Sequence, residues 1–156
     1  MCIRDSYKGA EITDYLAQLK AAAFKELQEP DILITSDTIV WFKEKALNKP
    51  QDKEEAFKMI SSLSGNTHEV ITSVCFTTSK NQITIHDTTQ VTFKNLTAEE
   101  INYYIDNFQP YDKAGGYGIQ EWFGYIAVTR LEGSYFNVMG LPTHKVYETL
   151  MQLADS

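Results

Sequence analysis

The chain has 156 residues, of which 43% are hydrophobic and 22% are charged, a size and composition typical of one globular domain with an apolar core. Its 21 acidic and 14 basic residues give a net charge of −7, which argues against binding long nucleic acids, because such proteins need a basic surface. The two cysteines, Cys2 and Cys75, form no CxxC pair, and neither a signal peptide nor a membrane-spanning apolar run is recognisable. We therefore expect a cytoplasmic protein without nucleic-acid or membrane partners, in which a few lysines could still hold a small anionic ligand.

The first part of the chain predicts a helix followed by a strand. Apolar residues at helical spacing favour a helix over Glu11–Leu27, which Pro30 ends. The face expected to pack on the core consists of Ile12, Tyr15, Leu16, Leu19, Ala22, Ala23 and Leu27. Asp31–Ser36 is typical of a buried strand, and the extended pattern continues to Phe42.

The middle of the chain predicts a second helix and a long hairpin. Asp52–Leu63 begins with a capping aspartate and is followed by Gly65, where a left-handed C-terminal cap is expected. His68–Thr78 and Gln82–Lys94 are rich in Val, Ile, Thr and Phe and are separated by a short turn, which indicates a β-hairpin.

The last third predicts a helix, a loop, a strand and a closing helix. A capping box opens a helix from Thr97 to about Asn107, and residues 109–121 are expected to be loop. Gly124–Leu131 is typical of a strand, and Pro142–Leu153 of a helix that begins with proline. Helices mixed with strands and a hairpin indicate an α/β or α+β fold on a mixed sheet.

Asp37 is the first candidate for chemistry. It follows an apolar run in the first predicted strand. Because ligands of open α/β sheets bind at strand ends, this carboxylate could bind a metal or activate water. An aspartate that caps a turn or accepts backbone hydrogen bonds is the alternative.

Two lysines could bind phosphate. Pro50 fixes the backbone directly after Lys49, which would aim that ammonium group, and Lys20 lies on the first predicted helix. For each of them a solvated surface lysine is the competing interpretation. His68 could shuttle protons or bond to a backbone carbonyl of its turn, and the scattered histidines have no zinc-ligand spacing.

Two glycine-bounded segments complete the candidates. Asp112–Gln120 reads DKAGGYGIQ, in which three glycines would let the backbone approach a ligand closely. Lys113 could bind a phosphate there and Gln120 could present a donor and an acceptor to a nucleobase, although a simple tight turn remains open. Gly133–Pro142 could hold an anion at the start of the last helix, or could be a plain connection.

Taken in order, these segments resemble the Maf family of nucleoside triphosphate pyrophosphatases. The matching segments are Leu16–Ala21, Ser36–Val40, Asn48–Pro50, Leu63–Thr72, Asp112–Gln120 and Gly133–Pro142. The resemblance implies a single elongated α/β domain on a mixed β-sheet flanked by helices, often as a homodimer. It also implies an enzyme that hydrolyses a nucleoside triphosphate to the monophosphate and pyrophosphate, and the DKAGxYGIQ form looks like the branch that acts on dTTP and UTP.

The resemblance further implies roles for single residues. Asp37 would be the general base and metal contact, directly or through water, with Mg²⁺ or Mn²⁺ as the cofactor. Lys20 and Lys49 would stabilise charge on the phosphates. Thr38 and Gln120 match positions that set base preference.

Lys113 is a further substrate-binding candidate at the same loop, where Gly116 and Gly118 would serve the loop's shape. The family's N-terminal SxSPRR segment, whose arginines and backbone amides hold the triphosphate, has no counterpart in the printed sequence. We therefore expect residues 1–6 to be unrelated or artefactual and 7–156 to form an N-terminally truncated domain. The expected consequences are an unpaired sheet edge where the first strand is missing, and hydrolysis that is slow or absent.

Two alternatives of function stay open at this point. One is a related pyrophosphatase for another nucleotide, such as 7-methyl-GTP. The other is a non-catalytic nucleotide-binding regulator of cell division, since the family has been linked to division arrest.

Overall fold

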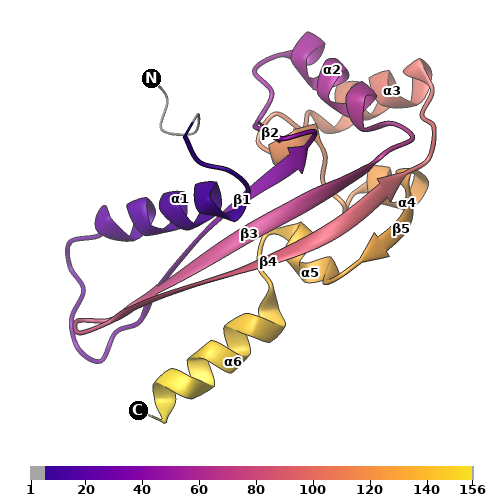
Figure 1. Cartoon of the computed structure of the whole chain (residues 1–156). Helices are drawn as coiled ribbons and strands as arrows, with labels where there is room; N and C mark the ends of the chain where they lie inside the picture. The colour runs from indigo at the N-terminus through magenta and orange to yellow at the C-terminus, as the bar shows by residue number, and fades with distance from the viewer. Residues whose placement is uncertain (1–5, 156) are drawn as a thin grey trace.

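The computed structural model describes residues 6–155, which form one sheet flanked by helices (Figure 1). The strands are β1 (Leu33–Phe42), β2 (Lys45–Leu47), β3 (Thr67–Thr77), β4 (Gln82–Phe93) and β5 (Val128–Glu132), in the spatial order β2-β1-β3-β4-β5. The predicted α/β class is therefore confirmed. Every pairing between these strands is antiparallel, so the expectation of a mixed sheet is wrong in this detail.

The helices cover both faces of the sheet. They are α1 (Ala10–Ala22), α2 (Lys53–Leu63), α3 (Ala98–Phe108), α4 (Trp122–Ala127), α5 (Tyr135–Met139) and α6 (Thr143–Ala154), with a 3₁₀ turn at Ala114–Gly116. Helix α1 packs on Ile39 and Ile71, whereas Val146 of α6 packs on Val74 and Phe76. Because strand residues alternate between faces, α1 and α6 lie on opposite sides of the hairpin (Figure 1).

Capping residues explain why α2 and α3 begin where the sequence predicts. The Asp52 side chain accepts a hydrogen bond from the Glu55 backbone N–H at 2.8 Å and begins α2. Thr97 and Glu100 exchange the two hydrogen bonds of a capping box at the start of α3. These bonds satisfy backbone N–H groups that a helix start leaves without partners.

Helix α1 differs from its prediction in length and in buried face. It ends at Ala22, and Leu19 is 52% exposed. Ala17 and Ala21 are buried instead, and their small side chains let the helix backbone approach β1, where the Thr35 hydroxyl donates to the Ala17 carbonyl at 2.7 Å. Close packing of the backbone, rather than a stripe of large side chains, therefore sets the face of α1.

The strand predicted over Gly124–Leu131 is wrong in its first half. Residues up to Ala127 belong to α4, and the strand begins only at Val128. Phe123 and Ala127 are fully buried and four residues apart, which is helical spacing. A helix of six residues shows its periodicity only once, so the β-branched residues that follow it dominate the pattern and predict a strand.

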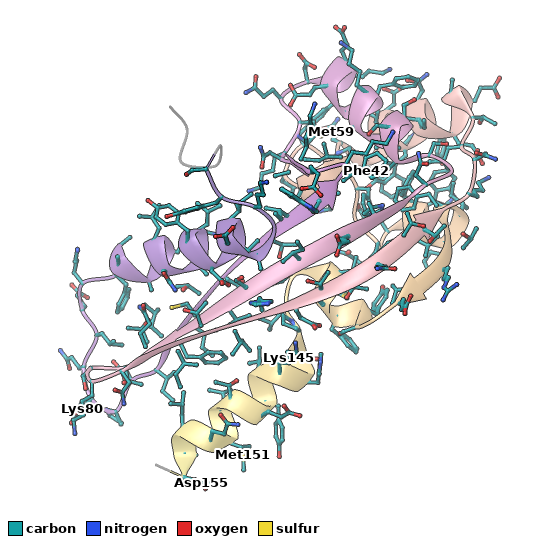
Figure 2. The ribbon with its side chains drawn as sticks, viewed as in Figure 1. Phe42, Met59, Lys80, Lys145, Met151 and Asp155 are labelled. Atoms are coloured by element: carbon teal, nitrogen blue, oxygen red, sulfur yellow. The ribbon has the colours of Figure 1, made fainter. Side chains whose placement is uncertain are left out.

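The main core lies at one end of the sheet, beneath α2 and α3. Phe93, Tyr104 and Phe123 are fully buried there with the apolar side chains of both helices. Figure 2 labels Phe42 and Met59 at this end and Lys80 at the opposite tip of the hairpin. This end of the molecule supports the loop that follows α3.

The outer edge of β1 is only partly paired among the described residues. Strand β2 pairs only with Val40–Phe42, and no other strand of the described residues pairs with Leu33–Ile39 on that side. Residues 1–5, most of the segment that we expect to be unrelated, lie outside the described residues. Within the described range no helix is long and apolar enough to cross a bilayer.

Candidate functional site

A cleft of about 340 Å³ opens along β1. Its lining comes from α1, from the residue before Pro50, from the glycine loop 112–120 and from the end of α5. All six candidate site residues line it: Lys20, Asp37, Thr38, Lys49, Lys113 and Gln120. Residues up to 100 positions apart in sequence thus share one hollow, while their roles remain predictions.

Strand β1 divides the cleft into two sides. Asp37 and Thr38 are successive strand residues and point to opposite faces of the sheet. Thr38 shares its face with Val40, and the strand register places Val70 of β3 opposite Val40. The cleft therefore has a carboxylate on the α1 side of β1 and a hydroxyl with apolar neighbours on the other side.

Lys20 and Asp37 form the charged part of the cleft. Lys20 Nζ lies 3.1 Å from Asp37 Oδ1 and donates to the Ser36 carbonyl at 2.8 Å. The Asp37 side chain is 18% exposed, and the residue lies in the middle of β1 rather than at its end. Asp37 lines the cleft, and within residues 6–155 no strand pairs with this part of β1 on its outer edge.

Lys49 is tied to the glycine loop through its preceding residue. The Gly115 backbone N–H donates to the Asn48 carbonyl at 3.2 Å. Gly115 has a φ of +72°, and a Cβ at this position would lie 2.6 Å from Val40 Cγ2. The loop can therefore lie against the floor of the cleft only because this residue is glycine.

We expect Gly115→Ala to lower the free energy of unfolding by about 2–4 kcal/mol, because backbone strain adds to an overlap with Val40. Gly9→Ala is the matched control, since Gly9 also has a positive φ but its Cβ would meet its nearest neighbour at 3.8 Å. Urea unfolding of both variants separates strain from overlap. Equal losses in the two variants would contradict this role of Gly115.

Tyr104 of α3 supports the glycine loop from below. Its hydroxyl accepts from the Gly118 backbone N–H at 2.9 Å and donates to Glu121 Oε1 at 2.7 Å. Burial and the neighbouring Glu121 carboxylate raise the pKa of Tyr104 far above its ordinary value. The phenol therefore stays protonated and keeps both hydrogen bonds.

His68 holds the same loop from the hairpin, which the sequence interpretation missed. It is 2% exposed, and its Nε2 lies 2.6 Å from the Tyr117 hydroxyl rather than bonding a turn carbonyl. Phe93 packs against both rings edge to face. Burial lowers the pKa of His68 from 6.5 to about 4 and raises that of Tyr117, so both groups are neutral near pH 7.

The opposite wall of the cleft is the end of α5, formed by Val138, Met139 and Gly140. The segment Gly133–Pro142, expected as a loop, contains this short helix, which Ser134 caps by accepting from the Asn137 backbone N–H at 3.2 Å. Asn137, in the middle of this helix, is fully buried. A five-residue helix gives too few periods to be found in a sequence.

No cluster of three or more His, Cys, Asp or Glu side chains that could hold a metal occurs within residues 6–155. The cleft offers two carboxylates: Asp37 beside Lys20, and Asp112, which is 77% exposed. This donor set suits Mg²⁺, which keeps several waters and binds through one or two carboxylates together with substrate phosphates. His86 Nδ1 of β4 lies 3.8 Å from Asp14 Oδ1 of α1, and neither residue lines the cleft.

Comparison with known proteins agrees with the sequence pattern. The family model described as "Maf-like protein" matches residues 3–153. A relative from Flavobacterium johnsoniae, named dTTP/UTP pyrophosphatase, is 64% identical over 147 residues, which cover 94% of this chain and 76% of the relative. Relatives with the same name from Christiangramia forsetii and Bacteroides fragilis are 59% and 50% identical, each over 96% of this chain and over 76% and 78% of their own lengths. This chain therefore belongs to the Maf family.

Proposed function

We propose that the chain is a nucleoside triphosphate pyrophosphatase that hydrolyses dTTP and UTP to the monophosphate and pyrophosphate. The observation that carries the proposal is one cleft whose lining includes two carboxylates, three lysines and a glutamine. The names of relatives that are 50–64% identical support the same reaction and the same pyrimidine substrates.

The lysines account for the triphosphate. Lys20, Lys49 and Lys113 line the cleft and would neutralise the phosphate oxygens, which carry the charge during the reaction. Lys20 already binds Asp37 and the Ser36 carbonyl, so its ammonium group is held in place before the substrate arrives. A lysine fixed in this way loses less conformational freedom on binding.

Asp37 is the proposed general base. It would accept a proton from the attacking water while the bond that links the α and β phosphates breaks and pyrophosphate leaves. Lys20, whose Nζ lies 3.1 Å from Asp37 Oδ1, would hold the carboxylate group in place in the cleft. Asp37 and Asp112 are also the residues that would hold Mg²⁺ or Mn²⁺, which would offset phosphate charge and polarise the phosphorus.

Gln120 is proposed to read the pyrimidine edge, because its amide offers one acceptor and a donor group. We expect Gln120→Ala to weaken UTP binding about 10-fold and to reduce the preference for UTP over purine nucleotides. Gln90→Ala, an exposed glutamine on β4 outside the cleft, is the control. Calorimetric titration with UTP and GTP measures both quantities, and an unchanged preference would assign base reading to another residue.

The direct test is pyrophosphate release from UTP, dTTP, CTP and 7-methyl-GTP by this polypeptide with Mg²⁺. We expect the highest rates of pyrophosphate release with UTP and dTTP. A higher rate with 7-methyl-GTP would favour the related pyrophosphatase for that nucleotide. Nucleotide binding without any release would favour the non-catalytic regulator.

The homodimer and the cytoplasmic location remain proposals that rest on the same family. Size-exclusion chromatography with light scattering tests the first. Fractionation of the source cells tests the second.

A further inference from the structure

A chain of three oxygen atoms leads from the cleft into the sheet. Thr38 Oγ1 lies 2.9 Å from Thr72 Oγ1, which lies 3.1 Å from the backbone carbonyl oxygen of Asn137. Thr38 lines the cleft, whereas Thr72 and Asn137 are fully buried. Two oxygens this close in a buried site repel each other unless a proton lies between them.

The available protons settle the direction of this chain. A carbonyl oxygen can only accept, and each threonine hydroxyl has one proton to donate. Two protons must serve two contacts, so Thr72 donates to the Asn137 carbonyl and Thr38 donates to Thr72. The proton of Thr38 is therefore used inside the protein, and its hydroxyl offers only lone pairs to the cleft.

The far end of the chain is held firmly. Asn137 Nδ2 lies 3.0–3.2 Å from the Val70 carbonyl, the Asp87 carbonyl and the Thr89 hydroxyl, which belong to β3 and β4. These acceptors fix the side-chain amide with its nitrogen toward the sheet, because an oxygen there would face two carbonyls. The carbonyl that receives the Thr72 proton belongs to the same residue, so it keeps its position.

The surroundings of Thr38 suit a flat base. Val40 and Val70 lie on its face of the sheet. On the opposite wall, a Cβ added to Gly140 would lie 3.7 Å from Thr38 Oγ1, so the glycine leaves this side of the cleft free of a side chain. The Lys20–Asp37 pair lies on the other side of β1. A nucleotide that places its phosphates at this ion pair would place its base on the Thr38 side.

We propose that Thr72 and Asn137 are positioning residues that hold Thr38 as a hydrogen-bond acceptor for the N3–H group of uracil or thymine. The inference rests on the proposed function and extends it to the group that is read. Cytosine carries a lone pair on N3, which would face the lone pairs of Thr38. The hydrogen bonds from Thr38 to Thr72 and from Thr72 to the Asn137 carbonyl thus select against CTP, because they leave Thr38 as an acceptor only. No charged residue is needed for this selection.

The first test compares equilibrium binding of UTP and CTP by calorimetry. In Thr72→Val the Thr38 proton loses its acceptor and can turn toward the ligand, so the UTP:CTP affinity ratio should fall about 10-fold. Thr72→Ser keeps the hydroxyl and should retain the ratio of the unmodified chain. Thr67→Val is the matched control, because Thr67 forms the same kind of hydroxyl pair with Thr92, at 2.7 Å, outside the cleft.

If Thr72 had a purely structural role, Thr72→Val would weaken the binding of UTP and CTP equally. An unchanged UTP:CTP affinity ratio in this variant would therefore overturn the inference. If the unmodified chain bound neither UTP nor dTTP, the proposed function itself would fail and base reading with it. A measurement without nucleotide tests the hydrogen bond alone: the unfolding midpoints of Thr38→Val, Thr72→Val and the double variant should be non-additive. Additive shifts would show that the two hydroxyls do not interact.

Discussion

Asp37→Asn should reduce the rate of pyrophosphate release at saturating UTP by about 10³-fold, because it removes the proposed general base and keeps the size of the side chain. Binding of UTP without metal should stay equal or become tighter, since a negative charge beside the phosphates is lost. Single-turnover assays with radiolabelled UTP measure slow release, and calorimetry measures binding. Together they separate chemistry from affinity.

Asp106→Asn provides the control for this substitution. Asp106 is an exposed carboxylate on α3 that pairs with Lys53 at 2.7 Å and does not line the cleft. Its replacement makes the same change in charge and should leave release unchanged. A rate for Asp37→Asn within threefold of the unmodified chain would assign the base to another group.

Acidification should destabilise the protein through His68. Its pKa is about 4 in the folded chain against an ordinary value of 6.5, so between these pH values the unfolded chain binds more protons. The free energy of unfolding therefore falls as the pH drops from 6.5 to 4, by up to about 3 kcal/mol from this residue. Well above pH 6.5 His68 is neutral in both the folded and the unfolded chain, so it no longer makes the free energy of unfolding depend on pH.

Urea unfolding at pH 7 and at pH 4.5 measures this effect. His68→Gln does not titrate and can still bond to Tyr117, so its stability should depend less on pH across this window. His86→Gln is the control, because His86 is 54% exposed and its replacement should leave the slope nearly intact. Identical slopes for the unmodified chain and His68→Gln would show that His68 does not set the acid sensitivity.

The sequence predicted best what neighbouring residues decide. The caps at Asp52 and Thr97 depend on residues three positions away, and the hairpin depends on two β-rich runs around a short turn. The left-handed Gly65 after α2, with φ +69°, follows from the same local rule. These features can be recognised in any segment without knowledge of the rest of the fold.

Features that depend on tertiary contacts were missed. The buried face of α1 is set by the approach of Ala17 to β1, and α4 is set by the burial of Phe123 and Ala127. His68 meets Tyr117 49 positions along the chain, which no local spacing indicates. The expected extension of α1 to Leu27 is wrong: the helix ends at Ala22, and residues 23–26 are exposed, so burial does not stabilise a longer helix.

The cleft illustrates the same division. The sequence pattern and the family resemblance together predict six site residues, and all six line one hollow. Neither of them predicts the residues that hold these six in position. Tyr104 and Asn137 act through the Gly118 N–H and through carbonyls of β3 and β4, partners that only the folded chain brings near.

The central claim is that this one cleft binds the whole nucleotide. Backbone NMR spectra of the chain recorded during titration with UTP and Mg²⁺ test it most directly. The expected result is that amide signals shift at residues 36–38, at Lys49, at 113–120 and at 138–140, on both sides of β1. Saturating UTP that left these signals unchanged, or moved only signals elsewhere on the surface, would contradict the claim.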